Sequence, residues 1–137
     1  MANEPVLIQD LEYRHLEVTM ADGSAGTNIE KHTILKLADP NTGAASSADG
    51  DLFLGILLEE NVGGDGTVKY AVSRHGVWDI KNKASTTITA GDMVKISGAN
   101  LIAPADDDQV EKHSEVIGMA LQDAAADEVI EVLVGAS

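Results

Sequence analysis

The residues that could do chemistry are few and scattered in this sequence. The four histidines, His15, His32, His75 and His113, contain no pair at the i, i+2 or i, i+4 spacing that a metal site on one strand or helix needs. Cysteine is absent, so neither a disulfide nor a thiolate ligand is available. We therefore expect no metal and no cofactor. A metal held by distant histidines is the minor alternative to single surface histidines.

The other candidate motifs are also incomplete. The acidic run 106–108 is contiguous and lacks the glycine turn of a calcium loop, which favours a solvated loop. The glycine-rich stretch 63–66 lacks the Lys-Ser/Thr of a phosphate loop and precedes an expected strand, so we interpret it as a turn. No Gly-x-Ser-x-Gly elbow surrounds the serines considered as nucleophiles, which are Ser24, Ser46, Ser47 and Ser73. No catalytic residue is predicted.

The charge balance limits the partners. Nine basic residues against 23 acidic ones give a formal charge of −14. Such a surface repels nucleic acid and anionic membranes, so we expect neither as a partner. It favours solubility, a basic partner surface or a salty medium, and composition does not separate these. Basic residues are concentrated in one part of the sequence, at Lys69, Arg74, Lys81 and Lys83. They belong either to an ordinary mixed surface or to a patch that contacts an acidic partner or another subunit.

Short apolar runs punctuated by Gly, Asn, Asp and Pro predict an all-β fold with at most one or two short helices. The best helical window is 107–116, and residues 44–51 are predicted to form an exposed loop. The N-terminal residues contain neither a basic segment nor a long apolar run, so we expect no signal peptide and no transmembrane helix. The expected strands are 33–37, 52–58, 67–74, 77–81, 93–96, 101–104, 116–121 and 129–134.

The two halves of the chain follow one pattern. Residues 33–37 correspond to 93–96, residues 54–58 to 117–121, and residues 66–72 to 127–133. Neither half has enough strands to close a core alone, so we predict a small β-barrel or sandwich built from two similar halves. We divide the chain into an N-terminal arm and leading strand, residues 1–30, and a single β domain, residues 31–137. The domain contains two pseudo-repeats, at about 31–80 and 90–137.

Several short motifs of the sequence resemble those of a known protein family. They include a Gly-Asp-x-Val turn and strand, an apolar Gly-centred strand, a terminal alternating strand after an Ala-rich acidic turn, and a mid-chain Gly-Val strand. These are Gly91-Asp92-Met93-Val94, Val116-Ile117-Gly118-Met119-Ala120-Leu121, residues 123–134, and Arg74-His75-Gly76-Val77-Trp78-Asp79-Ile80. Over residues 30–137 the chain resembles the head decoration proteins of tailed phages, also called capsid-stabilising or cement proteins, which have a duplicated β unit.

The resemblance implies a virion structural protein on the outer surface of an icosahedral capsid, made in the host cytoplasm. Such a protein ties neighbouring major capsid protein subunits together against the internal DNA pressure. It has no enzymatic activity, and it clusters as homotrimers, less often as dimers. We expect residues 2–18 and the loop 44–51 to make capsid or intersubunit contacts, together with two mid-chain residues. The candidate contact residues are Val6, Leu7, Ile8, Leu11, Tyr13, Arg14, Arg74 and Trp78.

Other functions stay open at this point. The first is a different virion structural domain, in a tail tube, connector or fibre. An enzyme or a carbohydrate-binding module is the second, although few aromatic residues are available to stack on a sugar. They are Tyr13, Phe53, Tyr70 and Trp78. A halophilic setting would also explain the acidity.

Overall fold

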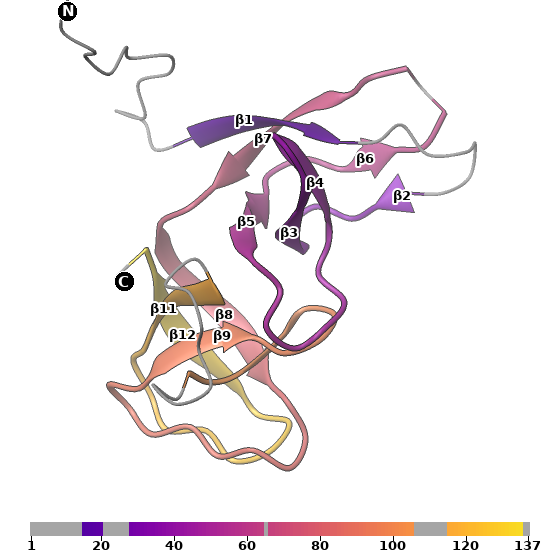
Figure 1. Cartoon of the computed structure of the whole chain (residues 1–137). Helices are drawn as coiled ribbons and strands as arrows, with labels where there is room; N and C mark the ends of the chain where they lie inside the picture. Colours follow the sequence, from indigo (N-terminus) through magenta and orange to yellow (C-terminus); the bar gives the residue numbers. More distant parts are fainter. Residues whose placement is uncertain (1–14, 21–27, 65, 106–114, 136–137) are drawn as a thin grey trace, which may run out of the picture.

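The computed structural model describes residues 15–20, 28–64, 66–105 and 115–135. These residues form twelve β-strands and no α-helix, and ten of the strands close into two five-stranded barrels (Figure 1). The predicted all-β fold of two similar halves is confirmed, but the expectation that neither half could close alone is wrong, because each half supplies the five strands of its own barrel. The helical window 107–116 lies outside the described residues, except for its last two. No helix long and apolar enough to cross a membrane occurs in the described ranges.

The first barrel occupies the N-terminal half of the chain. A separate two-stranded sheet, β2 (Asn28–Ile29) with β6 (Asn61–Val62), extends from it. The strand order of the first barrel is β1-β4-β3-β5-β7, and β7 pairs with β1 to close the ring. The barrel strands are β1 (His15–Met20), β3 (Ile34–Asp39), β4 (Thr42–Ala45), β5 (Phe53–Leu57) and β7 (Lys69–Ser73).

The second barrel follows after a two-residue connection. Its strand order is β10-β8-β12-β11-β9, and β9 pairs with β10 to close the ring. In β12 the buried and exposed side chains alternate, because successive side chains of a strand point to opposite faces. The strands are β8 (Gly76–Asn82), β9 (Met93–Ile96), β10 (Leu101–Pro104), β11 (Val116–Ala120) and β12 (Val129–Val134).

Both barrels have the same topology. In each, the first strand lies parallel to the third and antiparallel to the fifth. The second strand pairs antiparallel with the third and fourth, and the fourth pairs with the fifth. The three correspondences read from the sequence therefore join equivalent strands: β3 with β9, β5 with β11, and β7 with β12. The leading strands β1 and β8, which carry less of the repeated pattern, are also equivalent.

A glycine stands at the same place in each barrel. Gly55 in β5 and Gly118 in β11 each lie where the fifth strand of their own barrel passes closest. A Cβ on Gly118 would overlap the Leu133 carbonyl oxygen, and a Cβ on Gly55 would lie 3.0 Å from the Ser73 carbonyl oxygen. The Gly at the third residue of each of these strands thus leaves room for the closing strand.

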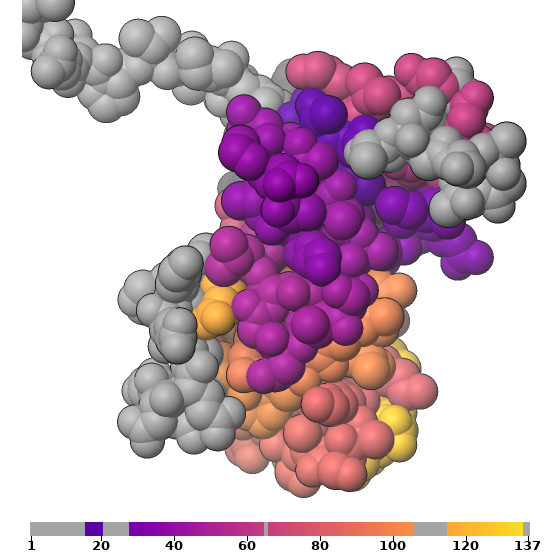
Figure 2. Space-filling model, turned by 45° about the vertical axis from the view of Figure 1, so that its right-hand side comes forward, coloured from indigo at the N-terminus to yellow at the C-terminus, as the bar shows by residue number. Residues whose placement is uncertain are grey.

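The hydrophobic core of the second barrel extends into the first. Ile34, Phe53 and Ile56 belong to the first barrel by sequence, yet they join the buried cluster of the second. The rest of the first barrel has its own core, which includes Leu35 and Val72, both fully buried. The two barrels therefore share apolar packing and form one body, and Figure 2 shows their surfaces in continuous contact.

Polar contacts lock the same junction. Asn100 lies in the β9–β10 turn, and its side-chain Oδ1 accepts a hydrogen bond from the Ile34 backbone N–H at 2.8 Å. The backbone N–H of Asn100 donates to the Ser46 hydroxyl at 3.0 Å. The Ser97 hydroxyl donates to one oxygen of Asp49 at 2.9 Å, and the buried Lys95 ammonium donates to the other at 3.2 Å. These residues form the polar joint between the barrels.

The loop prediction for residues 44–51 is wrong in part. Ala44 and Ala45 end strand β4, and Ser46 is buried beneath the β9–β10 turn. The Gly50 amide donates to the Ile96 carbonyl at 3.1 Å. Figure 1 shows this segment reaching down from β4 to the second barrel. Small polar residues are typical of exposed loops, but here their size allows the backbone of residues 46–50 to approach that of residues 96–100 closely.

We predict that Gly118→Ala destabilises the protein by about 3 kcal/mol, because the new methyl group has to displace the β12 backbone. Gly91→Ala is the matched control: a Cβ there meets nothing within 4 Å, and only its φ of +95° opposes alanine. This backbone strain costs about 1–2 kcal/mol. Urea unfolding of both variants measures the difference, and equal losses would contradict the close approach of β12.

A second prediction concerns the pH dependence of the polar joint. Burial raises the pKa of Asp49, but hydrogen bonds from Ser97 and Lys95 and the charges of Lys95 and Lys83 outweigh it, so the pKa falls below 3.8. A carboxyl whose pKa is lowered by folding contributes stability above its unfolded pKa and loses it as the pH falls through the folded value. Asp49→Asn should therefore be less stable than wild type at pH 7, by only about 0.5–1 kcal/mol, because the Asp49 side chain is 57% exposed and solvent screens its interaction with Lys95.

The difference should shrink as the pH falls below about 4, where the wild-type carboxyl also becomes neutral. Denaturant titrations at pH 7, 4 and 3 measure it. Glu60→Gln, at an exposed carboxyl of the first barrel, is the control and should change stability little at any pH. A constant difference between Asp49→Asn and wild type from pH 7 to 3 would exclude this electrostatic origin.

Candidate interaction surface

The described residues contain little that could catalyse a reaction. They contain no group of three or more His, Asp or Glu residues placed to bind a metal. The Ser73 hydroxyl lies 3.3 Å from Nδ1 of His75, but it also donates to the His75 carbonyl at 3.0 Å. Since the hydroxyl hydrogen is engaged by a carbonyl group, this pair lacks the geometry of an activated nucleophile.

Two of the eight candidate contact residues lie within the described ranges, and both are at the junction of the barrels. The exposed Arg74 guanidinium stands over the Phe53 ring, 5.5 Å from its centroid. The half-buried Trp78 donates its indole N–H to the His75 carbonyl at 2.9 Å, and its ring meets the His32 ring edge-on at 5.2 Å. The other six, Val6, Leu7, Ile8, Leu11, Tyr13 and Arg14, lie outside the described residues.

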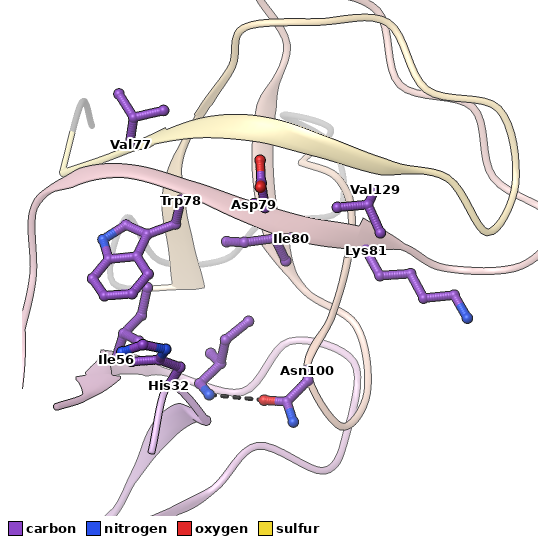
Figure 3. A pocket seen from close by; sticks show the side chains of 10 residues that line it. His32, Ile56, Val77, Trp78, Asp79, Ile80, Lys81, Asn100 and Val129 are labelled. Carbon is purple, nitrogen blue, oxygen red and sulfur yellow. Dashed lines mark hydrogen bonds between the residues drawn. The ribbon is translucent and has the colours of Figure 1, made fainter. Parts of the chain in front are cut away.

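A groove of about 490 Å³ runs along the junction beside Trp78 (Figure 3). Buried Ile56 and Ile80 are among the apolar residues that line it, and His32 and Trp78 form one side. Asn100 of the polar joint and Lys81 lie on the far side of the groove. The groove is therefore largely apolar with a polar margin, which is the usual character of a contact site.

The outward face of β8 and β12 adjoins this groove. We call it the β8–β12 face; it carries three cross-strand pairs. The first is Val77 with Leu133, the second is Asp79 with Glu131, and the third is Lys81 with Val129. Val77 and Val129 are 56% and 59% exposed, more than any other large apolar side chain in the described ranges. An apolar surface left open to water at both ends of a sheet face is a candidate for contact with another protein.

The basic residues do not gather into one patch. Lys69 lies on β7 of the first barrel, and Arg74 lies in the connection between the barrels. Lys81 lines the apolar groove, whereas Lys83 lines a second cleft with Asp49 and Lys95. The mixed-surface interpretation of this concentration fits the structure better than a single basic patch.

Sequence reasoning missed most of the β8–β12 face. Alternation along residues 77–81 and 129–134 marks their outward side chains, but only the pairing register shows that Val77 meets Leu133 and that Asp79 meets Glu131. The joint residues Asp49, Lys95 and Asn100 carried no sequence signal, because they are far apart in the chain.

Comparisons with known proteins agree with this architecture. The structure resembles the crystal structure of the head fibre gp8.5 N base of bacteriophage phi29, with a TM-score of 0.52 and 18% identity over 88% of this chain and 94% of that one. At this identity the likeness concerns the fold alone. A search of the curated proteins found no match.

The family comparison is more specific. The model of a family described as phage cement protein matches residues 65–136, which is more than half of the 137 residues and includes the whole second barrel. This match confirms the resemblance drawn from the Gly-Asp-x-Val turn, the Gly-centred strand β11 and the terminal strand β12. The chain belongs to the phage cement protein family, and it is a capsid-stabilising structural protein of the virion.

Proposed function

We propose that the protein binds the outer surface of the assembled icosahedral capsid and holds neighbouring major capsid protein subunits together. The observation that carries this proposal is the family match across the second barrel, the barrel that also presents the β8–β12 face. The rigid junction between the barrels supports it, because a body that spans two subunits must resist bending to hold them together.

The energetics of such a role rest on repetition. A single docking surface of a few residues binds weakly, but identical contacts repeated over a symmetric shell, or made by linked copies, add to a large stabilisation. We propose a homotrimer as the bound form, with a dimer as the alternative. The charge of −14 keeps free copies apart in solution and discourages binding to DNA, so attachment depends on local complementary surfaces.

We also propose that the protein has no enzymatic activity. The scattered histidines of the sequence and the engaged hydroxyl of Ser73 support this. The N-terminal residues Val6, Leu7, Ile8, Leu11, Tyr13 and Arg14 are proposed as a capsid or intersubunit contact arm, because they combine apolar and aromatic side chains. Arg74 and Trp78 are proposed as further contacts beside the groove. We also propose that residues 1–30 form an N-terminal arm and leading strand and that residues 31–137 form a single β domain.

One observation favours a second function. The similar phi29 structure is the base of a head fibre, so this chain is alternatively the capsid-bound base of a fibre. Tail-tube and connector roles have no such support. Electron microscopy of decorated particles tests both functions. Groups of three copies lying flat between capsid subunits would support the cement role, density continuing outward would favour the fibre base, and rings of six or more copies would contradict both.

We predict that deleting residues 2–10 weakens binding to capsids. Burial of a Val, Leu or Ile side chain contributes about 1.5–3 kcal/mol, so losing Val6, Leu7 and Ile8 should reduce affinity at least about tenfold. Co-sedimentation of the purified variant with capsids that lack this protein measures the change. The control deletion of residues 2–4 removes no large apolar side chain and should leave binding unchanged. Equal binding by both deletions would contradict a contact role for the arm.

A further inference from the structure

We propose that the β8–β12 face is the surface that docks on the major capsid protein, and that it receives a basic side chain of that partner between Asp79 and Glu131. This inference rests on the proposed capsid-binding function and names the site and the chemistry of the contact.

The closed barrels decide how a partner can bind this face. Each of β8 and β12 is paired on both sides, β8 with β10 and β12, and β12 with β8 and β11. β8 pairs with β10 only at Lys81 and Asn82, but all three pairs of the face stand on the continuous β8–β12 ladder, where the two backbones are paired with each other. A partner that covers these strands must therefore contact their outward side chains, and the three cross-strand pairs are the features it meets.

The middle pair is electrostatically unfavourable in the free protein. Asp79 and Glu131 stand directly opposite each other on adjacent strands. Opposed like charges destabilise a sheet. The two ion pairs among the described residues, Lys36–Asp51 and Lys95–Asp49, involve neither carboxylate. Lys81 is the nearest cation along β8, but its side chain extends away from Asp79 (Figure 3).

The flanking pairs supply an apolar frame. Val77 and Leu133 lie on one side of the carboxylates, and Val129 lies on the other. With a rise of about 3.4 Å per residue, the three pairs span about 14 Å, enough for a short stretch of a partner chain. Covering the two exposed valines removes apolar surface from water and lowers the local dielectric, which strengthens any charge pair formed between them.

These features select the partner by charge complementarity. A guanidinium or ammonium group placed between Asp79 and Glu131 would relieve their repulsion and gain hydrogen bonds that both carboxylates can accept. Lys81, at the far end, repels a basic group and therefore favours its entry from the Val77 side. The adjoining groove can hold an apolar side chain of the same segment. The occupant is thus a segment of the capsid protein that carries one basic and at least one apolar side chain.

The cleft at the polar joint is a weaker candidate site. It is lined by Lys83 and Lys95, which would suit an acidic group. However, the Lys95 ammonium is buried and already paired with Asp49. A ligand there would compete with a contact that holds the barrels together, whereas docking on the β8–β12 face disturbs no contact of the fold.

The test compares two double variants that change the net charge equally. Asp79→Asn with Glu131→Gln removes both carboxylates of the face, and Asp39→Asn with Glu60→Gln removes two exposed carboxylates of the first barrel. Binding to capsids that lack this protein is measured by co-sedimentation at low and moderate salt. We expect the face variant to bind about 10- to 100-fold more weakly, as when charged hydrogen bonds are lost, and the control variant to bind like wild type.

Two further measurements separate docking from folding and from self-association. The melting temperature of the face variant should equal or exceed that of wild type, because the cross-strand repulsion is gone. Its oligomeric state, measured by analytical ultracentrifugation, should be unchanged. Equal capsid binding by the face variant and the control, or a change in oligomeric state without a loss of capsid binding, would overturn the inference.

A third variant tests the apolar part of the face. Val77→Ser with Val129→Ser should also weaken capsid binding about tenfold or more, with little effect on stability at such exposed positions. Unchanged binding by this variant would likewise contradict docking through this face. If wild-type protein itself fails to bind capsids, the proposed function is wrong. Binding that is intact in wild type and in every face variant refutes only the docking site.

Discussion

Asn100 lies at the centre of the junction between the two barrels. Its side-chain oxygen accepts a hydrogen bond from the Ile34 backbone N–H, and its backbone N–H donates to the Ser46 hydroxyl. Around it, the Asp49 carboxylate is held by Ser97 and Lys95, and three apolar residues of the first barrel pack into the core of the second. The relative orientation of the barrels depends on this junction. So does the groove beside Trp78, whose sides come from both barrels.

The internal duplication explains why both halves of the chain close into barrels with the same strand pairing. Each half closes a five-stranded ring with the same pairing, including a parallel contact between its first and third strands. Each also needs a glycine in its fourth strand where the fifth strand passes, Gly55 in one half and Gly118 in the other. The halves differ where they meet: the β9–β10 turn of the second barrel contacts the first barrel through Asn100, which hydrogen-bonds to Ile34 and Ser46.

A strongly acidic protein can attach to a capsid only if part of its surface is complementary to the capsid protein. Its overall charge gives solubility, so attachment has to come from a local arrangement. The β8–β12 face is the one that we propose, with exposed valines at its ends and opposed carboxylates at its centre. The face lies in the barrel that the cement-protein family model covers in full. Stability of the fold and exposure of the binding surface are therefore compatible, because the same strands bury one face and present the other.

The sequence by itself determined the strand class, most strand positions and the duplication, because apolar periodicity, turn residues and a repeated Gly-centred strand are local signals. It also pointed to a phage head protein without marked catalytic groups. Only the tertiary structure decided that each half closes its own ring, that Ser46 is buried against Asn100, and that Asp79 faces Glu131. The physical reason is that closure, register and burial depend on which distant strands pair, and a one-residue change of register would turn each outward side chain into the core.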